Sequence, residues 1–338
     1  MLLEKRIAAL AELGNRLKQM DEGLEAVIHK TYLHNSWFTK ENTKQAIDAI
    51  VEEMLSKDLL EKWISHYTLS DDFISKNVGL ILAGNIPLVG FHDVLSVFLS
   101  GHRSKIKLSE KDRFLLPYIF EILKDIDPDT APYFEVMDRL ANFDAVIATG
   151  SNNTARYFDQ YFGKYPNIIR KNRNAIAVLD GKENESELKA LGRDVFQFFG
   201  LGCRNVSKVY LPKGYEFEPL LEALHTYNEL VLHNKYKNNF DYNYTLLIMN
   251  KIPHQSNGCV LMTEDTSLQS RIASLHYEYY EDKDQLQKDL ENKKEEIQCA
   301  VGRVDLDGIS VFPFGKAQQP ALMDYADGVD TMEFLLSI

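Results

Sequence analysis

Apolar residues recur at every third or fourth position through the first part of the chain, as far as about Tyr67. This spacing puts them on one face of successive helices, so it predicts a helical N-terminal segment. Residues 39–45 are rich in helix-capping side chains and precede the second of these runs, as is typical of a helix start. The segment carries no residue pattern that indicates chemistry.

From residue 77 onward, short apolar runs alternate with amphipathic runs. The apolar runs predict strands at residues 78–83, 105–108 and 145–148. The amphipathic runs predict helices at residues 89–100, 114–125 and 154–162. Such an alternation is typical of a parallel, doubly wound sheet, in which ligands bind at the carboxyl ends of the strands.

A second alternating block follows, and the break between the blocks lies near residues 165–174, which include Pro166 and a basic run. Strands are predicted at residues 175–179, 206–211 and 297–301, and helices at residues 186–199, 218–233 and 283–294. Further apolar segments occupy residues 244–249, 259–262 and 275–280. The sequence therefore predicts an α/β protein with two such sheets.

Charge, hydropathy and cysteine content exclude several classes of protein. The chain has 38 basic and 50 acidic residues, a net charge of −12, and no basic stripe that would bind nucleic acid. No apolar run approaches the roughly 18 residues of a membrane-spanning helix, and the first residues lack the apolar core of a signal peptide. Three scattered cysteines are too few for a disulfide framework or a zinc site. We therefore expect no metal and a reducing cytoplasm.

One cysteine lies in an unusual setting. Cys203 follows the sequence Phe198-Phe199-Gly200-Leu201-Gly202 and precedes the strand predicted at residues 206–211. Glycines on both sides of Leu201 remove side-chain bulk, so a substrate carbonyl or a cofactor ring could approach the sulfur closely. The alternative is a cysteine that packs as a small hydrophobic residue.

Three further motifs follow predicted strands of the first block. They are Gly84-Asn85-Ile86-Pro87, Lys107-Leu108-Ser109-Glu110 and Thr149-Gly150-Ser151. Each by itself is an ordinary polar turn. Asn85 could cap the helix that follows it, and Ser151 could do the same for its own helix.

Taken in order, these motifs resemble the cofactor domain of the aldehyde dehydrogenase superfamily. In that superfamily a strand leads to Asn-x-Pro, the next strand ends in Lys-Pro-Ser-Glu, a Thr-Gly-Ser follows, and a nucleophilic cysteine stands where Cys203 stands here. Glu296-Ile297 resembles the Glu-Ile that contacts the nicotinamide ribose, and residues 313–315 resemble the C-terminal Pro-Phe-Gly. The resemblance runs from about residue 78 to residue 338. The first 75 or so residues show no motif match.

Within the superfamily the chain is most similar to the acyl-CoA reductases related to the reductase component of bacterial bioluminescence. Ordinary aldehyde dehydrogenases carry a glutamate that activates the hydrolytic water, whereas the corresponding position here is Ile169 or Arg170. Without a positioned base, an acyl group on Cys203 is not quickly hydrolysed and can instead accept hydride. The resemblance thus implies that the protein reduces an acyl thioester to an aldehyde, with a long-chain acyl group as the expected substrate.

The resemblance also implies roles for individual residues. Cys203 would be the nucleophile, and the Asn85 side chain would donate to the oxyanion. The remaining candidates would bind NADPH, with NADH left open because the carboxylate of Glu110 repels a 2′-phosphate. These are Lys107, Ser109, Glu110, Gly150, Ser151 and Glu296.

The implied organisation has four parts. Residues 1–76 form the helical segment, 77–170 the NAD(P)-binding domain, 171–305 the catalytic domain, and 306–338 a segment that returns to the core. Only sixteen residues separate Glu296 from Pro313, where relatives have a longer segment, so the oligomeric state stays open. Whether a synthetase partner delivers the acyl group also stays open.

Two other functions compete with this interpretation. The chain could be another thioester or acyl-phosphate reductase of the superfamily, which differs only in its substrate. It could also be a catalytically silent binding or scaffold protein with the same fold.

Overall fold

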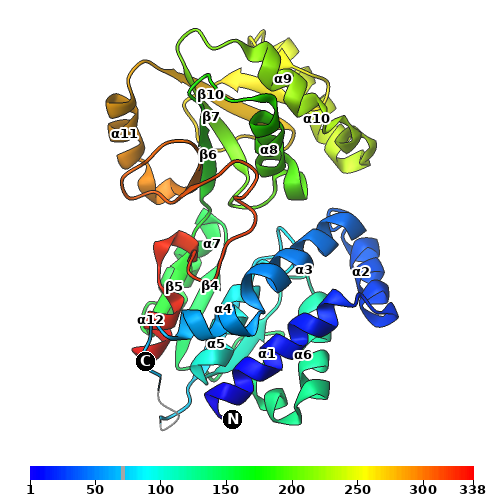
Figure 1. Cartoon of the computed structure of the whole chain (residues 1–338), viewed down its shortest axis with the longest axis vertical. Helices are drawn as coiled ribbons and strands as arrows, with labels where there is room; N and C mark the ends of the chain where they lie inside the picture. Colours follow the sequence, from blue (N-terminus) through cyan, green and yellow to red (C-terminus); the bar gives the residue numbers. More distant parts are fainter. Residues whose placement is uncertain (70–72) are drawn as a thin grey trace. The chain divides into compact units, whose positions relative to one another are not determined.

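The computed structural model describes residues 1–69 and 73–338, and these separate into two compact units. The first unit comprises residues 1–172 and 319–338, and the second comprises residues 173–318. Each unit has its own sheet covered by helices (Figure 1). Within the described ranges no helix is long and apolar enough to cross a membrane.

Four helices begin the first unit, as the apolar spacing predicted. They are α1 (Leu3–Lys18), α2 (Glu22–His34), α3 (Lys40–Met54) and α4 (Lys57–Ile64). The side chains of Asp21, Thr39 and Ser56 cap α2, α3 and α4 by accepting backbone hydrogen bonds. The apolar faces of these helices join the same core as the first sheet.

The first sheet has five parallel strands in the order β3-β2-β1-β4-β5. Their bounds are β1 (Asn77–Ile81), β2 (Arg103–Lys107), β3 (Phe134–Val136), β4 (Ala145–Thr149) and β5 (Asn167–Arg170). The helices of this unit that follow are α5 (Phe91–Ser100), α6 (Leu115–Ile126), α7 (Asn152–Phe162) and α12 (Thr331–Leu336). The predicted doubly wound sheet is confirmed, but the pattern missed β3 and β5. The strand β5 occupies the stretch where a break between blocks was expected.

The register brings three loops to one edge of this sheet. Ile81 of β1 pairs with Lys107 of β2 and with Ala148 of β4. Because all of these strands run in the same direction, the loops that follow them emerge side by side at the carboxyl edge.

The second sheet has seven strands in the order β12-β11-β6-β7-β10-β9-β8, and all neighbours are parallel except β8 and β9. The strands are β6 (Asn174–Val178), β7 (Val206–Pro212), β8 (Gln255–Ser256), β9 (Leu261–Glu264), β10 (Ser274–Tyr280), β11 (Ile297–Gly302) and β12 (Val311–Phe312). The helices are α8 (Glu185–Phe196), α9 (Phe217–His225), α10 (Asn234–Met249) and α11 (Lys283–Glu291).

Alternate residues of β6 enter two different cores, one on each face of this sheet. Ala175 and Ala177 pack with α8 and α9, whereas Ile176 and Val178 pack with α11. Figure 1 shows α8 and α11 on opposite sides of β6. The sheet is therefore buried on both faces, as parallel sheets normally are.

Two segments of this unit differ from the sequence-based expectation. The helix expected over residues 218–233 ends at His225 and is followed by a separate 3₁₀ turn, Asn228–Leu232. The apolar segment 244–249 is the end of α10. Its apolar residues Ile248 and Met249 are exposed, so this apolar run does not mark a buried element.

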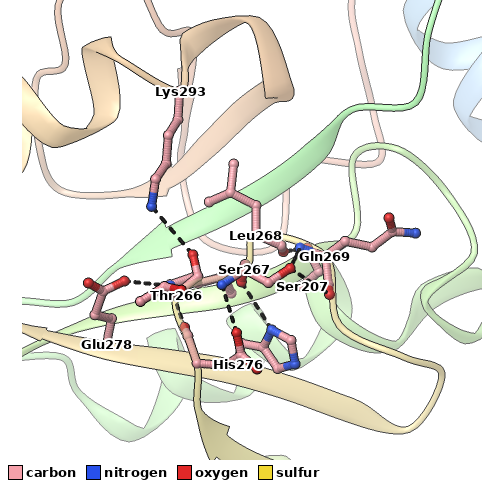
Figure 2. Close-up of polar contacts among 10 residues, drawn as sticks. Ser207, Thr266, Ser267, Leu268, Gln269, His276, Glu278 and Lys293 are labelled. Carbon is pink, nitrogen blue, oxygen red and sulfur yellow. Dashed lines mark hydrogen bonds and ion pairs between the residues drawn. The ribbon is translucent and has the colours of Figure 1, made fainter. Parts of the chain in front are cut away.

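The connection from β9 to β10 is short for two parallel strands, which usually need a helical crossover. Polar side chains hold it instead (Figure 2). Ser207 donates to the carbonyl of Leu268, and Lys208 donates to the carbonyl of Asp265 and to Glu278. Burial lowers the pKa of Lys208, while its ion pair with Glu278 acts in the opposite direction.

Candidate active site

The loops after β1 and β2 pack directly against each other in the first unit. Gly84 lies so close to Ser109 that a Cβ atom at position 84 would come within 2.4 Å of the Ser109 Oγ. A side chain at position 84 would therefore push the two loops apart. This explains why the Gly-Asn-x-Pro motif begins with glycine.

The Lys107–Glu110 motif forms the end of β2 and a tight turn. The Asp112 N–H donates to the Ser109 carbonyl at 3.1 Å and closes this turn. Lys107 donates to the carbonyl of Asp138 at 3.0 Å. The Glu110 side chain is 86% exposed and pairs with Arg113, so its carboxylate can be reached by a ligand.

The Thr-Gly-Ser motif joins the same edge of the first sheet. The Gly150 N–H donates to the carbonyl of Arg170 at the end of β5. Ser151 caps α7, and its Oγ accepts from the Thr154 N–H at 3.2 Å. The structure thus brings Asn85, Ser109 and Gly150 to one edge, as predicted from the order of the strands.

Arg170 ends β5 with its side chain buried. It is 6% exposed, forms an ion pair with Asp93 of α5 at 2.5 Å, and donates to the Thr331 hydroxyl at 2.9 Å. Asp93 is 4% exposed. Position 170 therefore holds a cation that is neutralised inside the protein.

In the second unit, Cys203 lies in a turn between α8 and β7, and it is partly exposed. The turn is reached through three successive residues in the left-handed region: Phe198 (φ 54°), Phe199 (φ 59°) and Gly200 (φ 75°). Left-handed backbone at a phenylalanine costs of order 1–3 kcal/mol and persists only where the surroundings enforce it.

Asn205 enforces the shape of this turn. Its Oδ1 accepts from the Gly202 N–H at 2.7 Å, and its own N–H donates back to the Gly202 carbonyl at 3.1 Å. Its Nδ2 donates to the carbonyls of Asp194 and Gln197 at 3.0 and 2.8 Å. The side chain of Asn205, which is 3% exposed, therefore links the end of α8 to the turn that contains Cys203.

Glu296 lies at the same edge of the second sheet as Cys203. It directly precedes β11, and Cys203 precedes β7. Ile297 pairs with Asn174 of β6, and Ala175 of β6 pairs with Val206 of β7, so both residues lie at the amino ends of their strands. Glu296 is exposed and ends a 3₁₀ turn, in the stretch between the helix predicted at residues 283–294 and the strand predicted at residues 297–301.

The other two cysteines are buried, as expected. Burial raises the pKa of Cys259 to about 11 and that of Cys299 to about 12, so neither thiol ionises near neutral pH. Among the described residues there is no group of three or more His, Cys, Asp or Glu side chains that could hold a metal ion.

Sequence reasoning missed the buried polar residues that hold these loops. They are Asp93, Asp112, Asp194 and Asn205. Two of them had a detectable signal. Asp93 is the charged residue of the mostly apolar helix α5, and Asp194 lies on the same face of α8 as Leu188 and Leu191. A carboxylate on an apolar face is rarely buried without partners.

Solved structures with a similar fold are aldehyde dehydrogenases. Aldehyde dehydrogenase 21 from Physcomitrella patens aligns with a TM-score of 0.68 at 12% identity and covers 100% of this chain and 84% of that one. An aldehyde dehydrogenase from Bacillus cereus, solved with NAD⁺, aligns with a TM-score of 0.67 at 14% identity and covers 93% of this chain and 76% of that one. The fold is thus that of an aldehyde dehydrogenase.

The sequence assigns the chain more narrowly. The family model for acyl-CoA reductase (LuxC) matches residues 4–224, so the chain belongs to the acyl-CoA reductase family. This confirms the resemblance found in the sequence. It also extends the match through the N-terminal helices, where no motif was visible.

Two curated relatives are similar over part of their length. The long-chain acyl-protein thioester reductase 2 of Photobacterium leiognathi is 22% identical over 223 residues, which are 59% of this chain and 46% of that protein. The long-chain acyl-protein thioester reductase of Photorhabdus laumondii is 20% identical over 208 residues, 54% of this chain and 42% of that one. The aligned region thus spans less than half the length of these relatives.

Proposed function

We propose that this protein reduces an acyl thioester, either acyl-CoA or a long-chain acyl-protein thioester, to an aldehyde at the expense of NADPH. Membership of the acyl-CoA reductase family and the names of the two relatives support this proposal. The first unit would bind the nicotinamide cofactor, and the second would supply the nucleophile.

In the proposed reaction, the Cys203 thiolate attacks the thioester carbonyl carbon. The carbonyl oxygen becomes an oxyanion that accepts hydrogen bonds from the Asn85 side chain and the Cys203 N–H. Collapse of this adduct expels the donor's sulfur as a thiolate, which takes up a proton from water, and leaves an acyl-Cys203 thioester. Addition of hydride to that thioester gives a hemithioacetal, which releases the aldehyde and restores the Cys203 thiolate.

The residues at the carboxyl edge of the first sheet fit a dinucleotide. The exposed Glu110 carboxylate is available to ribose hydroxyls, and Gly150 and Ser151 open α7, whose N-terminal end favours a phosphate group. Bound there, the cofactor supplies the hydride. Lys107 and Ser109 would contact the adenosine ribose, and Glu296 of the second unit the nicotinamide ribose, as the family resemblance implies.

The observation that carries the direction of the reaction is the buried Arg170–Asp93 pair. In ordinary aldehyde dehydrogenases the position that corresponds to Ile169 or Arg170 holds a glutamate that activates water, and an isoleucine side chain has no basic group. An arginine cannot act as a general base, because its guanidinium stays protonated. Asp93 accepts from this guanidinium at 2.5 Å in the protein interior. An acyl-Cys203 thioester should therefore persist until it is reduced.

The test is oxidation of NADPH, followed by its absorbance, with tetradecanoyl-CoA as acyl donor. Wild type, Cys203→Ala and the buried-cysteine control Cys259→Ala are compared, with NADH and acetyl-CoA in parallel. We expect turnover by wild type and Cys259→Ala alone, and production of a fatty aldehyde. Faster turnover of acetyl-CoA would contradict the long-chain assignment. Activity in Cys203→Ala would contradict the mechanism.

A further inference from the structure

The end of helix α8 is fastened to the C-terminal part of the second unit by Asp194. One Asp194 carboxylate oxygen accepts from the Gly315 N–H at 2.6 Å, and the other accepts from the Ala317 N–H at 3.0 Å. Asp194 is 1% exposed, and burial raises its pKa to about 6 against the opposing effect of these two donors. The segment 313–318 is thus held to α8 by two charge-assisted hydrogen bonds.

The same residue is also bonded to the cysteine turn. The backbone carbonyl of Asp194 accepts from Asn205 Nδ2 at 3.0 Å. Asn205 also accepts from the Gly202 N–H and donates to the Gly202 carbonyl. A continuous chain of hydrogen bonds therefore runs from Gly315 through Asp194 and Asn205 to the residue before Cys203. Because Asp194 and Asn205 are buried, breaking one of these hydrogen bonds leaves a polar group without its partner.

The fit of segment 313–318 onto α8 leaves little freedom. Gly315 has φ +80°, and a Cβ atom there would lie 2.7 Å from an Arg193 guanidinium nitrogen. Phe314 packs at the edge of the core that contains Leu191 and Val195 of α8. A shift of this segment would therefore be transmitted to the end of α8 rather than absorbed locally.

We propose that Asp194 and Asn205 form a relay that positions the Cys203 turn and couples it to segment 313–318. Both are positioning residues, because their side chains act on Cys203 through the turn. Only the expected effect on acyl transfer rests on the proposed function. The mechanical coupling is a property of the second unit alone.

The relay is tested with Asp194→Ala, Asn205→Ala and Asn205→Asp. The first removes the carboxylate that accepts from the Gly315 and Ala317 N–H groups and keeps the Asp194 backbone carbonyl that accepts from Asn205. Asn205→Asp keeps an acceptor for the Gly202 N–H but loses the donors to the α8 carbonyls. Asn243→Ala serves as the matched control, because Asn243 is also buried in this unit and donates to a backbone carbonyl, that of Ile272.

Hydrogen exchange of peptides 198–206 and 313–318 measures the coupling without any substrate. We expect Asp194→Ala to accelerate exchange in both peptides, and Asn243→Ala to leave both unchanged. Faster exchange in 313–318 alone would overturn the relay. If Asp194→Ala does not fold, Asn205→Asp tests the relay instead. The relay then predicts faster exchange in peptide 313–318 as well as at the end of α8.

Two reactions of Cys203, followed by mass spectrometry, measure the effect on function. Transfer of the acyl group from tetradecanoyl-CoA needs an oriented sulfur, and we expect it to slow by about tenfold or more in Asp194→Ala and Asn205→Ala. Alkylation by iodoacetamide is less demanding and should change by less than about threefold. Equal changes in both reactions would indicate a merely structural role and overturn the assignment. Coupled exchange without acylation of the wild type would preserve the relay and reject the proposed function.

Discussion

The carboxylate of Asp112 accepts a hydrogen bond from the Leu88 N–H at 2.8 Å. This contact ties the turn that begins at Ser109 to the loop that carries Asn85. Leu88 is held in the left-handed region, with φ 56°, which is uncommon for a leucine. The hydrogen bond from Asp112 helps to hold this backbone, so it supports the geometry of the candidate oxyanion loop.

Asp112 makes the stability of the protein dependent on pH. Burial raises the pKa of its carboxyl group to about 6, above the value of about 3.9 for an unfolded aspartate. Its contribution to stability is therefore full below about pH 4 and is lost as the pH rises through about 6. We expect Asp112→Asn to gain stability relative to wild type as the pH rises from about 4 to about 6.5, as measured by urea unfolding. The exposed control Glu4→Gln should show no such trend, and a parallel shift of both variants would contradict the prediction.

The Arg170–Asp93 pair should behave as a coupled unit. Arg170→Met leaves the Asp93 carboxylate buried without its countercharge, so we expect a loss of about 3–5 kcal/mol in the free energy of unfolding. The double variant Asp93→Leu/Arg170→Met removes both charges and should recover a substantial part of that loss. Denaturant unfolding of the two single variants and the double variant measures the coupling. Additive effects of the two substitutions would show that the pair is not coupled.

Asn85 should affect the chemical step and not the fold. If its amide donates to the oxyanion, Asn85→Ala should lower kcat by about 10²–10³. Asn85→Asp should be at least as slow, because a carboxylate repels the oxyanion. Thermal unfolding should change little in either variant. A loss confined to KM would assign Asn85 to substrate binding instead.

Glu110 should govern the choice between NADPH and NADH. Its exposed carboxylate disfavours a 2′-phosphate, so Glu110→Gln should shift the ratio of kcat/KM values toward NADPH by about tenfold. The neighbouring variant Arg113→Gln removes the ion-pair partner of Glu110 and should shift the ratio toward NADH. Unchanged ratios in both variants would place the adenosine ribose elsewhere.

The sequence by itself determined the class of fold, the helical N-terminus and the loops that carry the candidate motifs. These are local properties. The central strands β1, β4, β6 and β11 are buried on two faces and appear as short apolar runs, and the caps of helices are polar residues at fixed offsets. Cys203 could be singled out because its glycines and the strand after it are neighbours in the chain.

Only the tertiary structure decided how these loops are held. Asp93 meets Arg170, Asp112 meets Leu88, and Asp194 meets Gly315 across long stretches of chain. The apolar faces around Asp93 and Asp194 indicate that these carboxylates are buried, but no local pattern shows which donor a distant segment supplies. The short strands β3 and β5 escaped detection for the related reason that pairing with neighbours, more than their own composition, makes them strands.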